Sequence, residues 1–73
     1  MLDVVTMKEI DAIFEITDAL GIHREHLVIP LGTASPGQVR RLPNGKFEIT
    51  VEAERSFDEW LKELPALIAA ART

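Results

Sequence analysis

Two stretches of the chain repeat their apolar residues at the spacing of a helix with one buried face. The first predicts a helix from Met7 to about Leu20, and the second predicts a helix that begins near Phe57. In the first helix the expected buried positions are Ile10, Ile13, Phe14, Thr17 and Leu20, with Ile16 at the margin. In the second helix they are Phe57, Trp60 or Leu61, Leu64, Leu67 or Ile68, and Ala71.

Both helices are preceded by the sequence of a capping box. Thr6 is followed three positions later by Glu9, and Ser56 by Glu59. In this motif the hydroxyl oxygen accepts a hydrogen bond from the amide three residues on, and the carboxylate accepts one from the amide of the capping residue. Gly21 is placed to end the first helix in a left-handed conformation, which glycine adopts without strain.

Pro65 lies inside the second helical stretch. An interior proline lacks the amide hydrogen that the helix needs, and its ring collides with the preceding turn. We therefore expect a kink near Leu61–Pro65, or a break after which Pro65 begins a second short helix.

The segment between the helices has the pattern of a small sheet. A continuous apolar run rich in β-branched residues predicts a buried strand over Leu27–Leu31. Residues 22–26 are expected to be a connector and residues 32–37 a loop. Lys46 to Glu52 alternates, which predicts a strand with one buried face (Phe47, Ile49, Val51) and one face in water (Glu48, Thr50, Glu52).

The turn sequence Pro43–Gly45 predicts a β-hairpin with two alternative registers. A two-residue turn would set Arg40 opposite Ile49. A type I turn with a bulge at Gly45 would set Val39 opposite Ile49 and Arg40 opposite Glu48. The second register joins apolar residues on one face and opposite charges on the other, so we favour it. The fold class expected for residues 1–73 is a single small α+β domain with an N-terminal helix, a three-stranded sheet with a hairpin, and a C-terminal helix kinked at a proline.

Composition limits the classes of function. The chain has 73 residues, no cysteine and a net charge of −4. The absence of cysteine fits a reducing cytoplasm. The only basic cluster is Arg40–Arg41 with Lys46 nearby, so we expect no nucleic-acid partner. No apolar run has the length of a membrane span, so we expect no membrane partner.

The apolar content, 47%, is high for so short a chain. Two helices on three strands leave several apolar residues without an obvious neighbour: Met1, Leu2, Val4, Trp60 and Leu67 or Ile68. This predicts a homodimer with an interaction surface that includes Trp60, Leu2 and Val4. Two alternatives remain open at this point. Trp60 fits burial in the core or in a subunit interface, and the N-terminal segment fits an edge strand that folds back onto the sheet.

Few residues have the type and spacing of a metal-binding or catalytic site. His23 and His26 are three positions apart, but two ligands without a third make a poor metal site. Asp58, Glu59 and Glu63 are acidic neighbours without a nucleophile or an oxyanion site, and helix capping and a solvated helix face explain them. We therefore expect no catalytic residue, no metal and no cofactor.

The order of elements resembles the compact metallopeptidase core of the ImmA/IrrE type, a small gluzincin. Residues 44–51, Asn-Gly-Lys-Phe-Glu-Ile-Thr-Val, fit the family's hairpin strand, and residues 62–66, Lys-Glu-Leu-Pro-Ala, fall where its H-E-x-x-H helix motif would lie. That motif binds zinc through two histidines and uses the intervening glutamate as a general base. Glu63 is retained, whereas Lys62 and Ala66 replace the histidines. The resemblance, which covers about Met7 to Ala71, implies a zincin-like core without peptidase activity.

Three hypotheses of function follow. The first is a non-catalytic structural or protein-interaction domain in the cytoplasm, self-associating and zincin-like. The second is a regulatory module of phage or toxin–antitoxin type, whose hairpin edge adds a strand from a protein partner. The third is a metal-dependent hydrolase that uses His23, His26 and Glu63. The first is favoured because every polar residue that can be placed has a structural role.

Overall fold

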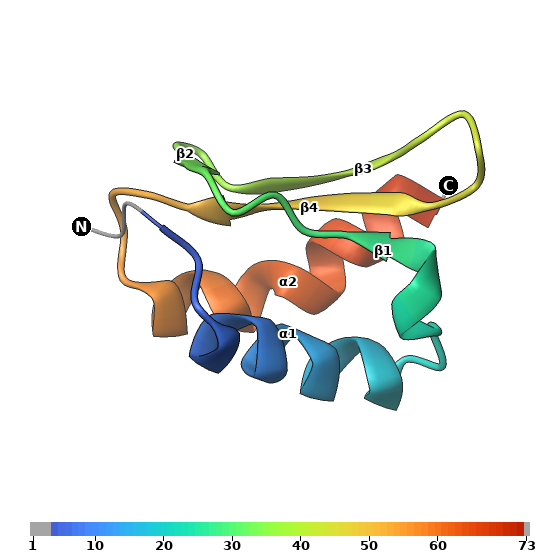
Figure 1. Cartoon of the computed structure of the whole chain (residues 1–73), viewed down its shortest axis with the longest axis horizontal. Coiled ribbons are helices and arrows are strands. Elements are labelled where there is room, and N and C mark those ends of the chain that lie inside the picture. The colour runs from blue at the N-terminus through green and yellow to red at the C-terminus, as the bar shows by residue number, and fades with distance from the viewer. Residues whose placement is uncertain (1–3, 73) are drawn as a thin grey trace.

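The computed structural model describes residues 4–72 as two helices packed on one face of a four-stranded sheet (Figure 1). The α+β class expected from the sequence is confirmed. The elements are the helices α1 (Met7–Ala19) and α2 (Phe57–Arg72), a short 3-10 turn η1 (Arg24–His26), and the strands β1 (Leu27–Val28), β2 (Thr33–Ala34), β3 (Gln38–Arg41) and β4 (Phe47–Glu52).

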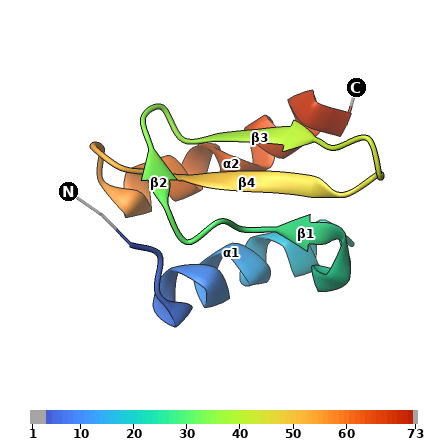
Figure 2. The ribbon, with the colours of Figure 1, turned by 45° about the horizontal axis from the view of Figure 1, so that its top comes forward.

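Strand β4 is the centre of the sheet, because every other strand pairs with it. β1 and β2 pair with β4 in parallel. β3 runs antiparallel to β4 (Figure 2). β1 and β3 pair with the same residues of β4, Phe47 and Glu48, so they lie along its two opposite edges. The sheet therefore has four strands and is mostly parallel, where the sequence predicted three.

The extra strand arises in the segment that composition assigned to a loop. The strand predicted over Leu27–Leu31 ends at Val28, and the chain pairs with β4 again at Thr33 and Ala34. Pro30 lies in the gap and has no amide hydrogen to donate, which favours an interruption there. The loop prediction for residues 32–37 was wrong at these two positions because pairing with β4 outweighed local turn composition.

The hairpin has the register that the hydrophobic pattern favoured. Val39 lies opposite Ile49 and Arg40 opposite Glu48. The Gly45 amide donates to the Leu42 carbonyl at 3.0 Å, and Gly45 has a φ of +86°. A non-glycine residue would be strained in this left-handed conformation, so the glycine lets the turn close with a bulge.

Helix α1 begins and ends where its signals predicted. The Thr6 amide donates to Glu9 Oε1 at 2.8 Å, and the Thr6 hydroxyl donates to the same oxygen at 2.6 Å. Gly21 follows the helix with a φ of +77°. The expected burial of Leu20 was wrong: this side chain is exposed, and Ile22 in the connector is buried instead. The chain reverses direction at Gly21, so the residue after the turn reaches the core.

Helix α2 runs without interruption from Phe57 to Arg72 with Pro65 inside it. The expectation of a break at this proline was therefore wrong, whereas a bend there stays a prediction. Pro65 is exposed, so the carbonyl that loses its helical partner lies on the side of the helix that faces away from the core. Packing of the buried face against the sheet favours a continuous helix.

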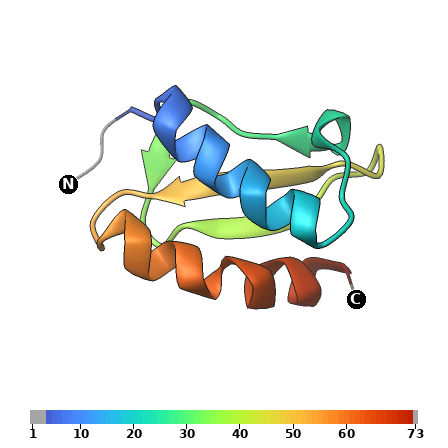
Figure 3. The ribbon, with the colours of Figure 1, turned by 90° about the horizontal axis from the view of Figure 1, so that it is seen from below.

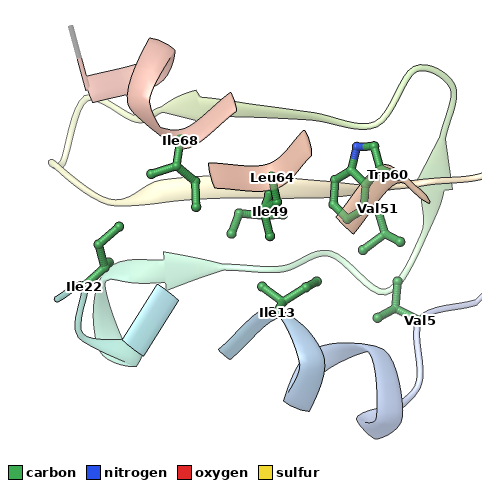
Figure 4. Close-up of a cluster of buried hydrophobic side chains, with 8 residues drawn as sticks. All are labelled: Val5, Ile13, Ile22, Ile49, Val51, Trp60, Leu64 and Ile68. Carbon is green, nitrogen blue, oxygen red and sulfur yellow. The ribbon is translucent and has the colours of Figure 1, made fainter. Parts of the chain in front are cut away.

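The core lies between the sheet and both helices (Figure 4). Helix α2 contributes Trp60, Leu64 and Ile68, so its buried stripe is the Trp60 alternative rather than the one centred on Leu61. Among residues 4–72, the buried apolar residues are Val5, Ile13, Ile22, Ile49, Val51, Trp60, Leu64 and Ile68. Trp60 and Ile68, which seemed to lack neighbours in the sequence, are covered within a single copy of the chain.

Residues 4 and 5 lie against the sheet, as the fold-back alternative predicted for the N-terminal segment. Val4 forms an isolated antiparallel bridge with Gly32, and the Val5 amide donates to the Leu31 carbonyl at 2.9 Å. Val5 is buried, but Val4 stays exposed. No helix within residues 4–72 is long and apolar enough to cross a membrane.

Candidate functional site

Of the three residues expected to form an interaction surface, two are described by the structure, and their side chains differ in exposure. Trp60 is only 1% exposed, so it belongs to the core and cannot contact a partner in this conformation. Val4 is 58% exposed, and Leu2 lies outside the described residues. Placing Trp60 on the surface was wrong because the segment around Gly37, which the sequence does not place in space, covers its indole ring.

The histidine pair lies at the turn η1 beside the end of α1. The rings of His23 and His26 meet edge to face, with centroids 5.8 Å apart, and both residues are exposed. His23 lines an open hollow of about 630 Å³, together with Asp18 and the other residues of 21–25, whereas His26 does not line it. Arg24 in this hollow is already engaged, since it pairs with Asp18 at 2.9 Å and stacks on the Phe14 ring. No group of three or more His, Cys, Asp or Glu residues among residues 4–72 is arranged to hold a metal ion.

The residues at the zinc-binding and general-base positions of the metallopeptidase motif lie on the outer side of α2. Lys62, Glu63 and Ala66 are exposed, and Leu64 between them is buried. The Glu63 carboxylate forms an ion pair with Arg55, which precedes the helix. The side chain that would act as a general base in the family is therefore engaged with an arginine here, at the surface of the helix.

A buried carboxylate that the sequence pattern placed in water lies at the end of β4. Glu52 is 1% exposed. Its Oε1 accepts a hydrogen bond from the Gly37 amide at 2.8 Å, and its Oε2 accepts one from the Glu54 amide at 3.1 Å and another from the Arg55 amide at 3.4 Å. The outward assignment of Glu52 was wrong because the segment that leads into β3 folds over this end of the sheet.

These hydrogen bonds stabilise the ionised form of Glu52. The Gly37 amide, followed by the Ser35 hydroxyl and the amides of Glu54 and Arg55, lowers the pKa of this carboxyl to about 2, against an ordinary value of 4.5. Burial opposes the shift but is the smaller effect. Glu52 therefore acts as an anionic anchor that holds the start of β3 and the start of the β4–α2 connection together.

Gly37 fits this anchor because it has no side chain. A β-carbon at this position would lie 2.6 Å from the Glu52 backbone nitrogen and 2.7 Å from Trp60 Nε1. The indole nitrogen is buried and has no hydrogen-bond partner among the described residues. We call Gly37, Glu52 and Trp60 the anchor cluster. Its only sequence signal is a glycine just before a strand, which does not reveal the distant residues that it approaches.

The anchor cluster positions one free edge of the sheet. Within residues 4–72, β3 pairs with β4 alone. The Leu42 amide donates to the Lys46 carbonyl at 2.7 Å, so Leu42 directs its backbone groups toward β4. Because this direction alternates along an antiparallel strand, Gln38 and Arg40 also bond to β4, whereas Val39 and Arg41 direct their N–H and C=O groups away from it. No hydrogen bond to these outward groups is found in the described part of the chain.

The same edge carries the basic cluster of the sequence. Arg40 and Arg41 are exposed, and Arg40 Nε donates to Glu48 Oε1 at 2.7 Å. Arg41 forms no ion pair within residues 4–72. Unpaired backbone groups next to exposed arginines can bind an extended chain through both hydrogen bonds and charge.

No family model, no curated protein and no solved structure matches the chain. The resemblance to a metallopeptidase core therefore stays a hypothesis.

Proposed function

We propose that this chain is a non-catalytic protein-interaction module that receives an extended segment of a partner protein at the free edge of β3. One observation carries the proposal: Val39 and Arg41 direct their backbone N–H and C=O groups away from the sheet, and these groups have no partner among the described residues. Such an edge is a template for a further strand, which natural proteins usually pair, cover or keep very short.

The opposite edge of the sheet differs in a way that supports this choice. There residues 4 and 5 of the same chain are already in place, with Val4 bridged to Gly32 and the Val5 amide bonded to the Leu31 carbonyl. In the described part of the chain no segment pairs with the free edge of β3, and helix α2 packs against this strand from below (Figure 3). A strand added beside β3 would extend the sheet above α2, which provides a surface for its side chains.

The charges on β3 favour a different protein over a second copy of this chain at the same edge. A second β3 would add its own Arg40 and Arg41 to one short ladder. Like charges across a ladder are unfavourable, and charged residues on an edge strand are a common device against self-pairing. The partner segment is therefore expected to come from another protein.

Strand addition is tested by nuclear magnetic resonance on the ¹⁵N-labelled chain. The probes are seven-residue peptides in which threonine and valine alternate, apart from two variable positions. We expect them to shift the amide signals of Gln38–Arg41 and to protect the Val39 and Arg41 amides from hydrogen exchange. The variant Arg41→Pro removes an outward N–H without removing a bond to β4, so it is expected to lose binding and keep its fold. Shifts spread over the surface, or absent from β3 with every peptide, would contradict the proposal.

Self-association is a second proposal, favoured by apolar side chains that lie exposed at the other edge. Val4, Leu31 and Met7 are 58%, 60% and 63% exposed, and the backbone bonds of residues 4 and 5 to residues 31 and 32 bring them to one end of the molecule. Exposed apolar residues that gather in one place are typical of subunit contacts.

We expect sedimentation at micromolar concentration to show a dimer that Leu31→Lys dissociates. Leu20→Lys, at another exposed leucine, is the matched control and should leave the mass unchanged. A monomer at all concentrations would refute self-association and leave the β3 proposal unaffected.

A further inference from the structure

We infer that the segment received by β3 carries two adjacent carboxylate side chains next to an apolar residue. The inference rests on the proposed function and names the chemistry of the partner at the same edge. It follows from the alternation of side chains along β3, from the charges there, and from what each face of the strand adjoins.

The two faces of β3 differ. Val39 lies opposite the buried Ile49 and packs against the core, so its side chain is on the helix side of the sheet. Side chains alternate along a strand, which places Arg41 on the helix side as well and Gln38 and Arg40 on the open side. Neighbouring residues of an added strand would therefore lie beside Arg41 on one face and beside Arg40 on the other.

Of the two arginines, Arg41 places the stronger requirement on the partner segment, namely a carboxylate opposite it. Among the described residues it has no carboxylate partner, and its side chain is exposed. A carboxylate at the position opposite Arg41 would form a new ion pair at the strand edge, where backbone pairing also holds the two chains in register. A basic residue at that position would instead be repelled by the positive charge of the Arg41 guanidinium group.

Arg40 accommodates a second carboxylate. Its Nε donates to Glu48 at 2.7 Å, which leaves the terminal guanidinium nitrogens for another acceptor. A carboxylate opposite Arg40 would place the guanidinium between two acidic groups on the open face. The next residue of an antiparallel segment lies opposite Val39 on the helix side, where an apolar side chain would continue the core above α2. For an antiparallel segment, the order along the partner chain is acidic, acidic, apolar.

The test compares two peptides that differ only in charge: Thr-Glu-Glu-Val-Thr-Val-Thr and Thr-Lys-Lys-Val-Thr-Val-Thr. Binding is measured by fluorescence anisotropy at low salt, and the contact is mapped by amide shifts. We expect the glutamate peptide to bind about tenfold more tightly, and the preference to weaken as salt is added. Arg41→Glu should reverse the preference, whereas Lys62→Glu, which makes the same charge change elsewhere on the surface, should not.

The outcomes separate this inference from the proposal beneath it. Equal binding of both peptides with shifts at β3 would overturn the charge inference and leave strand addition in place. Absence of shifts at β3 with either peptide would overturn both. Tight binding of the glutamate peptide that persists unchanged in Arg41→Glu would show that the acidic residues contact another part of the surface, and would also overturn the inference.

Discussion

Replacing Gly37 with alanine is expected to destabilise the fold by about 3 kcal/mol, in the range for overpacking a tightly filled site. The added β-carbon would lie 2.6 Å from the Glu52 nitrogen, 2.8 Å from the Glu52 α-carbon and 2.7 Å from Trp60 Nε1. Two of these atoms belong to the backbone of the central strand, and the third belongs to the largest buried side chain, so none can move without disturbing the core.

Gly32→Ala is the matched control for this prediction. Nothing lies within 4 Å of a β-carbon at Gly32, and its backbone is not in the left-handed region. We expect this variant to stay within about 0.5 kcal/mol of the parent. Unfolding in urea, followed by Trp60 fluorescence, measures both changes. Equal stability of the two alanine variants would mean that the segment before β3 does not pack tightly on Glu52 and Trp60.

Replacing Glu52 with glutamine is expected to lower the stability of the fold at neutral pH and to change its dependence on acid. The two carboxylate oxygens accept hydrogen bonds from the amides of Gly37, Glu54 and Arg55. A glutamine side chain would replace one acceptor oxygen with an NH₂ donor, which would face these amide donors in a buried site. The loss should exceed that of Glu54→Gln, a control at an exposed neighbour.

The pH dependence of the free energy of unfolding has a definite sign. Because the pKa of Glu52 is lowered to about 2 in the fold from an ordinary value of 4.5, the unfolded chain binds a proton more readily than the folded one. The stabilisation is fully present above pH 4.5 and is lost as the pH falls from 4.5 toward 2. Denaturant unfolding at a series of pH values should therefore show a steeper loss for the parent than for Glu52→Gln. Parallel curves would show that this carboxylate is not held by the fold.

Both changes act on the segment that leads into β3. Gly37 immediately precedes the strand, and its amide is held by Glu52 at 2.8 Å. The anchor cluster therefore determines where the free edge begins relative to β4 and α2. Partner binding at Arg40 and Arg41 is expected to depend on this anchor through the position of the strand, because none of the three anchor residues lies within β3.

Much of the fold follows from local signals in the sequence. The capping box at Thr6, the glycine after α1 and the turn before Lys46 each depend on residues a few positions apart, so their structure is readable from the chain. The hairpin register was also predictable, because only one alternative joined Val39 to Ile49 on a common apolar face. The basic character of the β3 edge is likewise visible as the pair Arg40–Arg41.

Tertiary structure decided the features that depend on distant parts of the chain. Thr33 and Ala34 form a strand only because β4 supplies their partners, and Pro65 stays within a continuous helix because its buried neighbours pack on the sheet. The alternation of β4 placed Glu52 in water, but amides from two other segments surround it. Trp60 is buried by the same approach of Gly37. Spacing along a chain specifies which side of a strand or helix a residue occupies, whereas contacts between distant segments determine what covers that side.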